Sequence, residues 1–303
     1  MDVIKLFQEF LMEQERAKSL LSAQFPSEKI DIYQDRIEDL IANLKVLMYY
    51  QISPNQLDSL LKLNKAHRNF DLLNEVGLEL EAYGKIAENI QTLLYKQGQL
   101  NTFRSNKPVD YCGDPIPWIT YPALEFLLQF DYKECVIFEF GAGNSTLFWA
   151  KRARNVVSVE TDFEWFEVLR EQKPFNVELT HIEDAEKFAE SIIQSTENFD
   201  VIVIDSLKYR YGATLNAVKR LAPGGVVIFD NSDWYPNSCQ LLRDAGLCQI
   251  DFHGFGPANG YTWTTSLFFK DGIKLKRIAS SLHPVGGINV HLDDDEPIYI
   301  YRK

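Results

Sequence analysis

Residues 136–146 read VIFEFGAGNST. A short apolar run is followed by a glycine-containing turn at residues 141–143, and small polar residues then begin a helical pattern. The order predicts a buried strand, a tight turn and a helix N-terminus. Backbone N–H groups at such a helix start are free to bind a ligand. The stretch therefore predicts a loop that binds a nucleotide-like cofactor.

The residues of the loop distinguish between two cofactor classes. A dinucleotide-binding turn carries a third glycine three residues after the second, and this chain has Thr146 there. Glu139 would repel a pyrophosphate but can organise an ammonium group. These features favour S-adenosylmethionine (SAM). The loop residues assigned to the cofactor are Glu139, Gly141, Ala142, Gly143, Asn144 and Ser145.

Two later acidic residues extend the predicted cofactor site. Residues 155–159 form a second apolar run that ends in Glu160, about twenty residues after the first strand, where a carboxylate can accept both ribose hydroxyls. A charge near a helix N-terminus is the alternative. A third strand, residues 177–182, leads to Asp184, which either meets the adenine amine or lies in a solvated turn.

Two further acids follow nearly continuous apolar runs. Residues 199–206 read FDVIVIDS, the pattern of a strand buried on both faces, and this strand delivers Asp205. After a helix predicted at residues 213–221, the sequence LAPGGVVIFDN contains a turn and a fifth strand that ends at Asp230. Open α/β sheets bind ligands at the carboxyl ends of their strands. We therefore expect Asp205 and Asp230 at one ligand-binding edge.

The segments EFGAGNST, VETD, FDVIVID and LAPGGVVIFDN, in this order, resemble the motifs of class I SAM-dependent methyltransferases across roughly residues 136–270. The resemblance implies an α/β fold, a doubly wound Rossmann-like sheet that is mostly parallel and closes with an antiparallel hairpin. Residues 248–255 and 261–269 are the candidate hairpin strands. It also implies an enzyme whose methyl donor is SAM.

A narrower resemblance concerns residues 205–211, DSLKYRY, which are similar to a segment of catechol O-methyltransferase and its metal-dependent relatives. It implies Asp205, Asp230 and Asn231 as Mg²⁺ ligands and Lys208 as the base for the acceptor hydroxyl. Oxygen ligands suit Mg²⁺, and a metal-bound hydroxyl ionises more readily. Asp205 is also counted among the catalytic residues and among the cofactor-binding residues.

The metal assignment has an alternative. Those relatives present a carboxylate from the late hairpin loop, whereas residues 254–260 of this chain contain no acid. A role for the strand-end acids in facing the substrate without metal therefore stays open. His253 is an alternative base, because its strand can point toward the acceptor.

Together these features predict O-methylation of a small hydroxylated acceptor, phenolic or sugar-like. N-methylation without metal and a non-catalytic, SAM-binding scaffold are the alternatives. Tyr121, which precedes the first predicted strand of the domain, is assigned to the cofactor. Trp234, Tyr235, Tyr261 and Trp263 form an aromatic cluster on which a ring of the acceptor could stack, and packing between strand ends is the alternative.

Composition supports the same class. The chain has 303 residues, 46% hydrophobic, with a net charge of −12. This charge argues against nucleic acid and against anionic membrane surfaces as partners. The four cysteines show no CxxC spacing, and the N-terminus lacks the features of a signal peptide, so a cytoplasmic protein is expected.

The chain is expected to have four regions. Residues 1–100 show helical spacing and form a helical N-terminal region, for oligomerisation or as a lid. Residues 101–122 form a connector rich in proline and aromatic residues, and residues 123–271 the SAM-binding domain. Residues 272–303 are a C-terminal extension.

Overall fold

The structure is a computed structural model that describes residues 89–278 and 284–287. The chain divides into two compact units, Met1–Glu88 and Asn89–Lys303, and all described residues belong to the second. Most of the predicted helical N-terminal region, and the end of the C-terminal extension, lie outside the described residues. None of the described helices has the length and apolar character of a membrane span.

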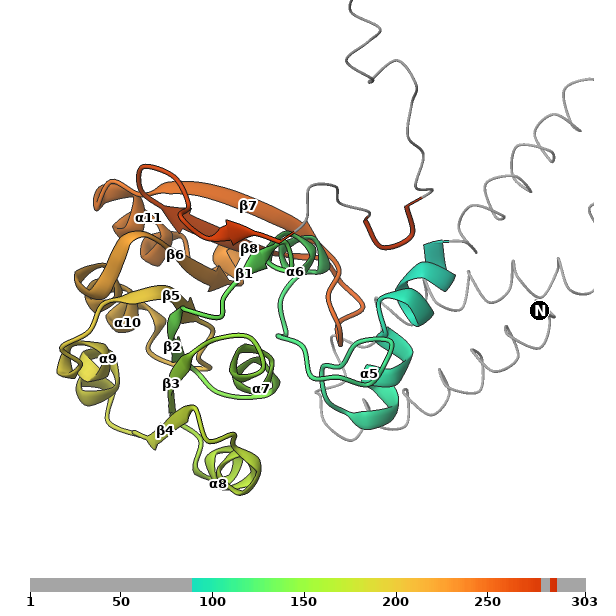
Figure 1. The fold of residues 1–303 in the computed structure, drawn as a ribbon, viewed down its shortest axis with the longest axis horizontal. Coiled ribbons are helices and arrows are strands. Elements are labelled where there is room, and N and C mark those ends of the chain that lie inside the picture. Colours follow the sequence, from blue (N-terminus) through green and yellow to red (C-terminus); the bar gives the residue numbers. More distant parts are fainter. Residues whose placement is uncertain (1–88, 279–283, 288–303) are drawn as a thin grey trace, which may run out of the picture. The chain divides into compact units, whose positions relative to one another are not determined.

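The described unit is built on a seven-stranded sheet with the order β4-β3-β2-β5-β6-β8-β7 (Figure 1). Its first five positions are parallel, and β8 is antiparallel to both of its neighbours. The strands are β2 (Val136–Phe140), β3 (Asn155–Glu160), β4 (Val177–His181), β5 (Phe199–Ile204), β6 (Leu221–Asp230), β7 (Cys248–Gly254) and β8 (Trp263–Phe269). The predicted doubly wound sheet with a closing antiparallel hairpin is confirmed.

The central strands β2 and β5 are mostly apolar because both faces of the sheet are covered (Figure 1). Successive side chains alternate between the faces, so Ile137 packs into one core and Phe138 into the other. The first core includes residues of α6 (Tyr121–Leu127) and α7 (Asn144–Ala150). The second includes residues of α9 (Ala185–Gln194), α10 (Arg210–Ala217) and α11 (Pro236–Asp244). The two cores therefore lie on opposite faces of the sheet.

The helices that connect the strands begin close to this edge. They are α8 (Phe163–Gln172), α9 (Ala185–Gln194), α10 (Arg210–Ala217) and α11 (Pro236–Asp244), with 3₁₀ turns η3 (Val218–Arg220) and η4 (Ser232–Trp234). Helix α10 begins three residues before the predicted start at 213 and ends at 217, and β6 begins five residues before the predicted strand. The Pro-Gly-Gly turn therefore lies within β6, where the register with β5 shifts.

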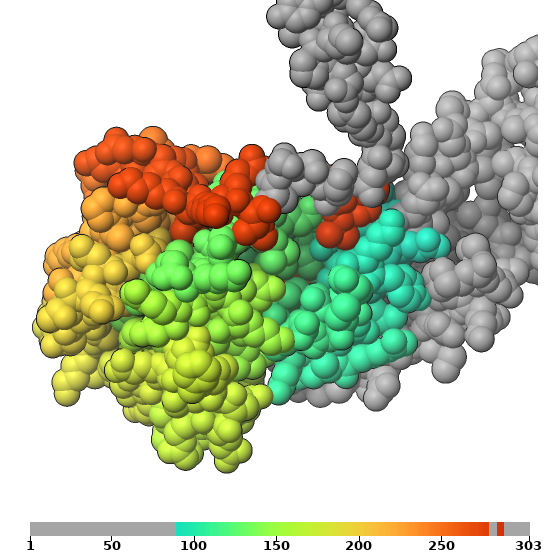
Figure 2. Space-filling view, in the orientation of Figure 1, coloured from blue at the N-terminus to red at the C-terminus, as the bar shows by residue number. Residues whose placement is uncertain are grey.

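The segment before the sheet contains a π-helix η2 (Thr92–Lys96) and α5 (Gln99–Ser105), which occupies the start of the predicted connector. The connector then runs along α7, where Lys151 pairs with Asp114 at 2.6 Å and Asn144 Nδ2 donates to Pro108 O at 2.6 Å. Figure 2 shows this teal and green surface as continuous. A separate two-stranded sheet joins β1 (Phe130–Asp131) to β9 (Lys276–Arg277).

Candidate active site

The glycine loop between β2 and α7 forms the centre of the candidate site. Gly141 has φ 93°, a left-handed conformation that favours glycine. A Cβ at this position would meet backbone atoms of Asp205 and Ser206 at 2.8 Å. The loop therefore lies directly against the chain that leaves β5, and only a residue without a side chain permits this approach.

Glu139 lies beneath the loop and is completely buried. Its Oε2 accepts hydrogen bonds from Thr146 Oγ1 at 2.5 Å and Ser158 Oγ at 2.8 Å, whereas its Oε1 has no partner within the described part of the chain. Burial raises the pKa of Glu139 to about 7, although hydroxyl hydrogen bonds lower it. An orphaned buried oxygen below the loop fits a ligand that brings a positively charged group or a bridging water.

Glu160, at the end of β3, fastens the loop. Its Oε2 accepts from Ala142 N at 2.8 Å, and its Oε1 accepts from Thr161 N at 2.7 Å and Asp162 N at 2.8 Å. The carboxylate thus orders the loop and keeps acceptor capacity on Oε2, because each carboxylate oxygen can accept more than one hydrogen bond. This arrangement fits a hydroxylated ligand such as a ribose.

The first turn of α8 closes this side of the loop. Trp165 Nε1 donates to Ala142 O at 2.6 Å, and Trp165 is partly exposed. Asp184 is exposed and caps α9, where its Oδ1 accepts from Lys187 N at 2.9 Å. Asp184 therefore has a structural role, and its proposed contact with adenine stays a prediction.

Asp205 follows β5 and is held by an arginine. Its side chain is 24% exposed, and its Oδ1 lies 2.9 Å from Arg210 Nη2. Burial raises the pKa of Asp205 to about 6, against the lowering effect of the guanidinium. A carboxylate at this position can accept a proton from a bound acceptor.

Asp230, at the end of β6, is buried more deeply. Its Oδ1 accepts from Thr265 Oγ1 at 2.5 Å and from Trp263 Nε1 at 3.0 Å, and both donors lie on β8. Thr265 in turn accepts from Thr120 N at 3.0 Å. Burial first, and then the charge of Asp205, raise the pKa of Asp230 well above its ordinary value. The two strand-end acids therefore lie together, as predicted.

The other predicted catalytic residues are less enclosed. Lys208 is exposed on the loop after Asp205. His253 is on the edge strand β7, where its Nδ1 lies 2.7 Å from Thr264 Oγ1. Asn231 adopts φ 53° at the turn after β6, a left-handed conformation that asparagine tolerates. The catalytic roles of Lys208 and His253 stay predictions.

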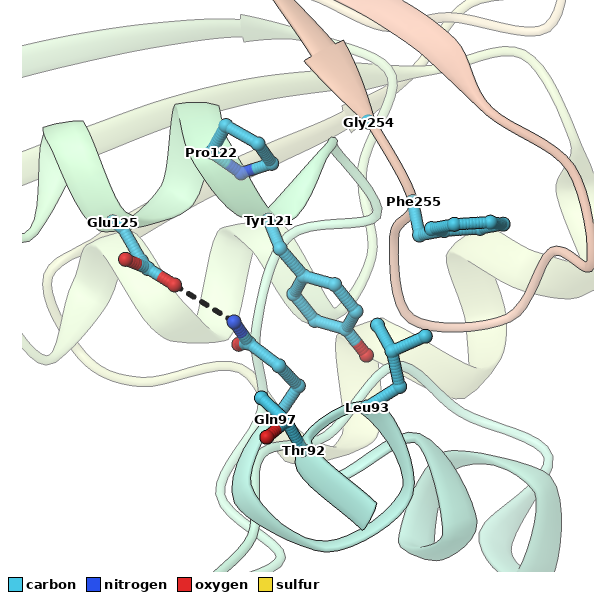
Figure 3. A pocket seen from close by; sticks show the side chains of 8 residues that line it. All are labelled: Thr92, Leu93, Gln97, Tyr121, Pro122, Glu125, Gly254 and Phe255. Atoms are coloured by element: carbon cyan, nitrogen blue, oxygen red, sulfur yellow. Dashed lines mark hydrogen bonds between the residues drawn. The ribbon is translucent and has the colours of Figure 1, made fainter. Parts of the chain in front are cut away.

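Tyr121 lines a cavity of about 310 Å³, which also contacts Leu93, Glu125 and Phe255. Figure 3 shows its ring between Leu93 and Phe255 on one side and the pair of Gln97 and Glu125 on the other, whose side chains are hydrogen-bonded at 2.7 Å. The hydroxyl is sealed from solvent and has no partner within the described residues. None of the residues that line this cavity belongs to the glycine loop. The predicted contact of Tyr121 with the cofactor stays a prediction.

Exposed aromatic side chains surround the carboxyl edge. They lie in the segments that follow β3, β5, β6 and β7 and before α6: Trp118, Phe163, Trp165, Tyr209, Tyr211, Trp234, Phe255 and Tyr261. The rings of Trp234 and Tyr261 are 6.3 Å apart, and those of Tyr261 and Trp263 are 6.0 Å apart. These three rings, which we call the aromatic shelf, lead from the surface to the Asp230 carboxylate.

The structure also adds site residues that the sequence did not predict. Arg210 and Thr265 contact the strand-end acids directly, and Ser158 contacts Glu139. Arg210 belongs to the segment DSLKYRY, but its spacing does not indicate which carboxylate it binds. Thr265 is distant in sequence from Asp230, and only the strand pairing of β6 with β8 brings the two together.

The residues predicted to bind Mg²⁺ do not fit a divalent ion in this arrangement. Oxygens of Asp205 and Asp230 accept hydrogen bonds from Arg210, Trp263 and Thr265, and a guanidinium lies beside them. In the described part of the chain, no group of three or more His, Cys, Asp or Glu side chains is arranged to hold a metal ion. By contrast, the glycine loop, Glu139 and Glu160 do fit SAM.

The fold and the loop define a class I SAM-dependent methyltransferase domain. Residues 138–232 match the sequence family described as "Methyltransferase domain", which covers the glycine loop and both strand-end acids. The chain therefore contains a SAM-dependent methyltransferase domain, whose cofactor is SAM. No curated protein matches the chain.

Several solved structures are similar over about half of the chain. The precorrin-6y C5,15-methyltransferase of Geobacter metallireducens GS-15 is 14% identical over 50% of this chain and 87% of its own, with a TM-score of 0.41. The N-methyltransferase NodS of Bradyrhizobium japonicum WM9 is 17% identical over 48% of this chain and 92% of its own, with a TM-score of 0.36. A methyltransferase from Pyrococcus furiosus is 22% identical over 62% of this chain and 100% of its own, with a TM-score of 0.37.

Proposed function

We propose that this enzyme methylates the hydroxyl group of a small, ring-bearing acceptor, phenolic or sugar-like. The observation that carries the proposal is the close approach of Asp205 to the glycine loop. A Cβ on Gly141 would lie 2.8 Å from the backbone oxygen of Asp205, and the side chain of this residue remains partly exposed. A carboxylate beside the methyl donor's loop can accept the proton of the acceptor hydroxyl.

The cofactor is held by the residues around the loop. When bound, SAM supplies a methyl group carried on a sulfonium. Residues 141–145 provide the backbone that grips it, Glu139 orients its ammonium group, and Glu160 accepts its ribose hydroxyls through Oε2. Asp184 and Tyr121 are the remaining proposed contacts. The acids at this edge also favour a cationic cofactor over an anionic one.

Asp205 is our proposed base, and Lys208 and His253 are the alternatives. Asp205 is the only one of the three whose backbone lies against the glycine loop among the described residues. Lys208 is on the same loop but exposed, and His253 is bonded to Thr264 on the neighbouring strand. The proton moves from the acceptor oxygen to a carboxylate oxygen of Asp205.

The aromatic shelf favours an acceptor that contains a ring. Trp234 is 55% exposed, so its face is available for stacking, and Trp263 donates its Nε1 hydrogen to Asp230. Flat aromatic surfaces stack on phenolic rings and on the apolar faces of sugars. An acceptor seated on the shelf would present its hydroxyl toward the strand-end acids.

The test combines binding and turnover. Calorimetry with SAM and with its demethylated product, S-adenosylhomocysteine (SAH), measures cofactor binding, and labelled SAM measures methyl transfer to a panel of phenols, sugars and amines. We expect Asp205→Asn to lower turnover at least about 100-fold, the range for a general base, with SAH binding nearly unchanged. The matched control is Asp271→Asn, because Asp271 is exposed and has a left-handed φ that asparagine tolerates.

Each contrary outcome has a specific meaning. Methylation of amines alone would replace the hydroxyl acceptor with an N-methylation activity. Loss of turnover in Lys208→Ala but not in Asp205→Asn would move the base to Lys208. SAH binding without transfer to any acceptor would favour a scaffold role, with the N-terminal region as the partner-binding or oligomerising element.

A further inference from the structure

Arg210 is a buried cation at the junction of β5 and β6. It is the first residue of α10, and its side chain is 7% exposed. Its Nε donates to Ser206 O at 2.6 Å, its Nη1 donates to Asp230 O, and its Nη2 donates to Asp205 Oδ1 at 2.9 Å. A guanidinium has five N–H donors in a fixed plane and keeps its charge at every accessible pH. One side chain thus ties together the chain segments that leave both strands.

Two aromatic rings fix the same guanidinium from its other sides. Its central carbon lies 4.8 Å from the ring centroid of Tyr235 and 6.0 Å from that of Phe229. A cation over an aromatic face is attracted by the ring's charge distribution, most strongly where water is excluded. The position of Arg210 is therefore set by the surrounding fold rather than by Asp205 alone.

Arg210 lies beside Asp205 and Asp230, two of the residues predicted to bind magnesium. Mg²⁺ requires near-octahedral oxygen ligands and binds carboxylates that can turn their lone pairs toward it. Asp205 Oδ1 is engaged by Arg210, and Asp230 accepts donors from both Trp263 and Thr265 on β8. A divalent ion placed between the two acids would also be repelled by the guanidinium.

We propose that Arg210 takes the place of a divalent metal ion as the fixed positive charge that joins the Asp205 carboxylate to the backbone oxygen of Asp230, and that methyl transfer by this enzyme requires no metal. Arg210 acts as a positioning residue that holds the Asp205 carboxylate beside the glycine loop. The proposal relies on the proposed function only in taking Asp205 as part of the transfer site.

A measurement of metal binding tests the proposal without any acceptor. Mn²⁺, as a paramagnetic probe for Mg²⁺, is titrated into the full chain with SAH present, and the free ion is followed by electron paramagnetic resonance. We expect no stoichiometric binding in the micromolar range. One tightly bound Mn²⁺ per chain that Asp230→Asn removes would overturn the proposal, whether or not an acceptor is known.

The rate of methyl transfer to the acceptor that the panel identifies also tests whether the enzyme needs a metal. Wild-type activity should be unchanged in excess EDTA, and activity lost to EDTA and restored by Mg²⁺ would refute the proposal. Arg210→Gln should lower kcat about 100-fold, the range seen when a fixed electrostatic group is removed, while the affinity for SAH stays within about threefold. Arg210→Lys keeps the charge without the planar fork and should recover part of the lost kcat.

The control variant is Arg243→Gln. Arg243 is exposed on α11 and bonds to the side chains of Gln240 and Gln249, so its replacement should leave turnover and metal binding unchanged. A wild-type kcat in Arg210→Gln would overturn the positioning role. If no acceptor is ever found, the proposed function fails, and the Mn²⁺ titration still decides whether the chain has a metal site.

Discussion

Glu160 shows how one side chain can serve both the fold and the ligand. It accepts hydrogen bonds from three backbone N–H groups, one of which belongs to the glycine loop. Charge-assisted hydrogen bonds of this kind are stronger than neutral ones. The geometry of the cofactor loop therefore depends on a carboxylate that lies on the next strand.

We predict that Glu160→Gln weakens SAH binding at least tenfold, about 1.4 kcal/mol. The amide replaces one acceptor oxygen with an NH₂ group. This group cannot accept a hydrogen bond from the loop N–H or from a ribose hydroxyl. Calorimetry with SAH measures the change. Glu171→Gln, on the exposed end of α8, is the control and should bind as wild type; equal affinities for all three proteins would contradict the assignment.

Glu139 should make the stability of the protein depend on pH. Its pKa is about 7 in the fold against an ordinary value of 4.5, so between these values the folded state holds a proton that the unfolded state releases. Stability is therefore highest below the unfolded pKa and falls as the pH rises through the folded pKa.

Between about pH 5 and about pH 8, we predict that the free energy of unfolding falls by about 2–3 kcal/mol more in the wild type than in Glu139→Gln. The size follows from the raised pKa, because one pKa unit corresponds to about 1.4 kcal/mol. Urea denaturation at both pH values measures the difference. The comparison of slopes cancels the effect of the other acids and any constant cost of the amide. Parallel pH dependences of the two proteins would show that Glu139 is not the titrating group.

At the scale of elements, the turn between β2 and α7 joins the cofactor loop to the end of β5. We predict that Gly141→Ala destabilises the fold by about 1–3 kcal/mol and abolishes SAH binding, because the new Cβ would combine a positive φ with contacts to backbone atoms at 2.8 Å. Urea denaturation and calorimetry measure the two effects. Gly260→Ala is the matched control, since nothing lies within 4 Å of a Cβ there.

The sequence predicted the central elements and not their side-chain partners. Continuous apolar runs such as residues 199–204 identify strands buried on both faces, and parallel pairing then places Asp205 and Asp230 at one edge. The partners of these acids could not be predicted, because Thr120 and Thr265 reach Asp230 only through the closing hairpin. Element boundaries also moved, as at α10, where Tyr209 takes φ 65° and allows the helix to begin at Arg210.

At the scale of the molecule, both hydrophobic cores and every proposed cofactor contact lie within Asn89–Lys303. We predict that residues 89–303, produced alone, fold and bind SAH within about threefold of the full chain, a change of less than about 1 kcal/mol. Calorimetry measures the binding. Failure of this fragment to bind would show that residues 1–88 complete the cofactor site.

The same fragment separates the two proposed roles of the N-terminal region. If the N-terminal region forms a lid, the fragment should transfer methyl groups more slowly but have the same number of subunits in solution as the full chain. If the N-terminal region joins subunits, analytical ultracentrifugation should show fewer subunits per assembly for the fragment than for the full chain. Both readouts are independent of the affinity for SAH.

The hydrogen bond from Trp165 to Ala142 has an optical consequence. An indole whose N–H is held by the cofactor loop, and whose ring is partly exposed, emits light that depends on how that loop is polarised and solvated. Seating the cofactor should change the intrinsic fluorescence of the protein, and Trp165→Phe should remove most of that change while the other tryptophans keep emitting. The chain thus carries its own reporter of cofactor arrival, and stopped-flow mixing could follow the binding step in real time without a label.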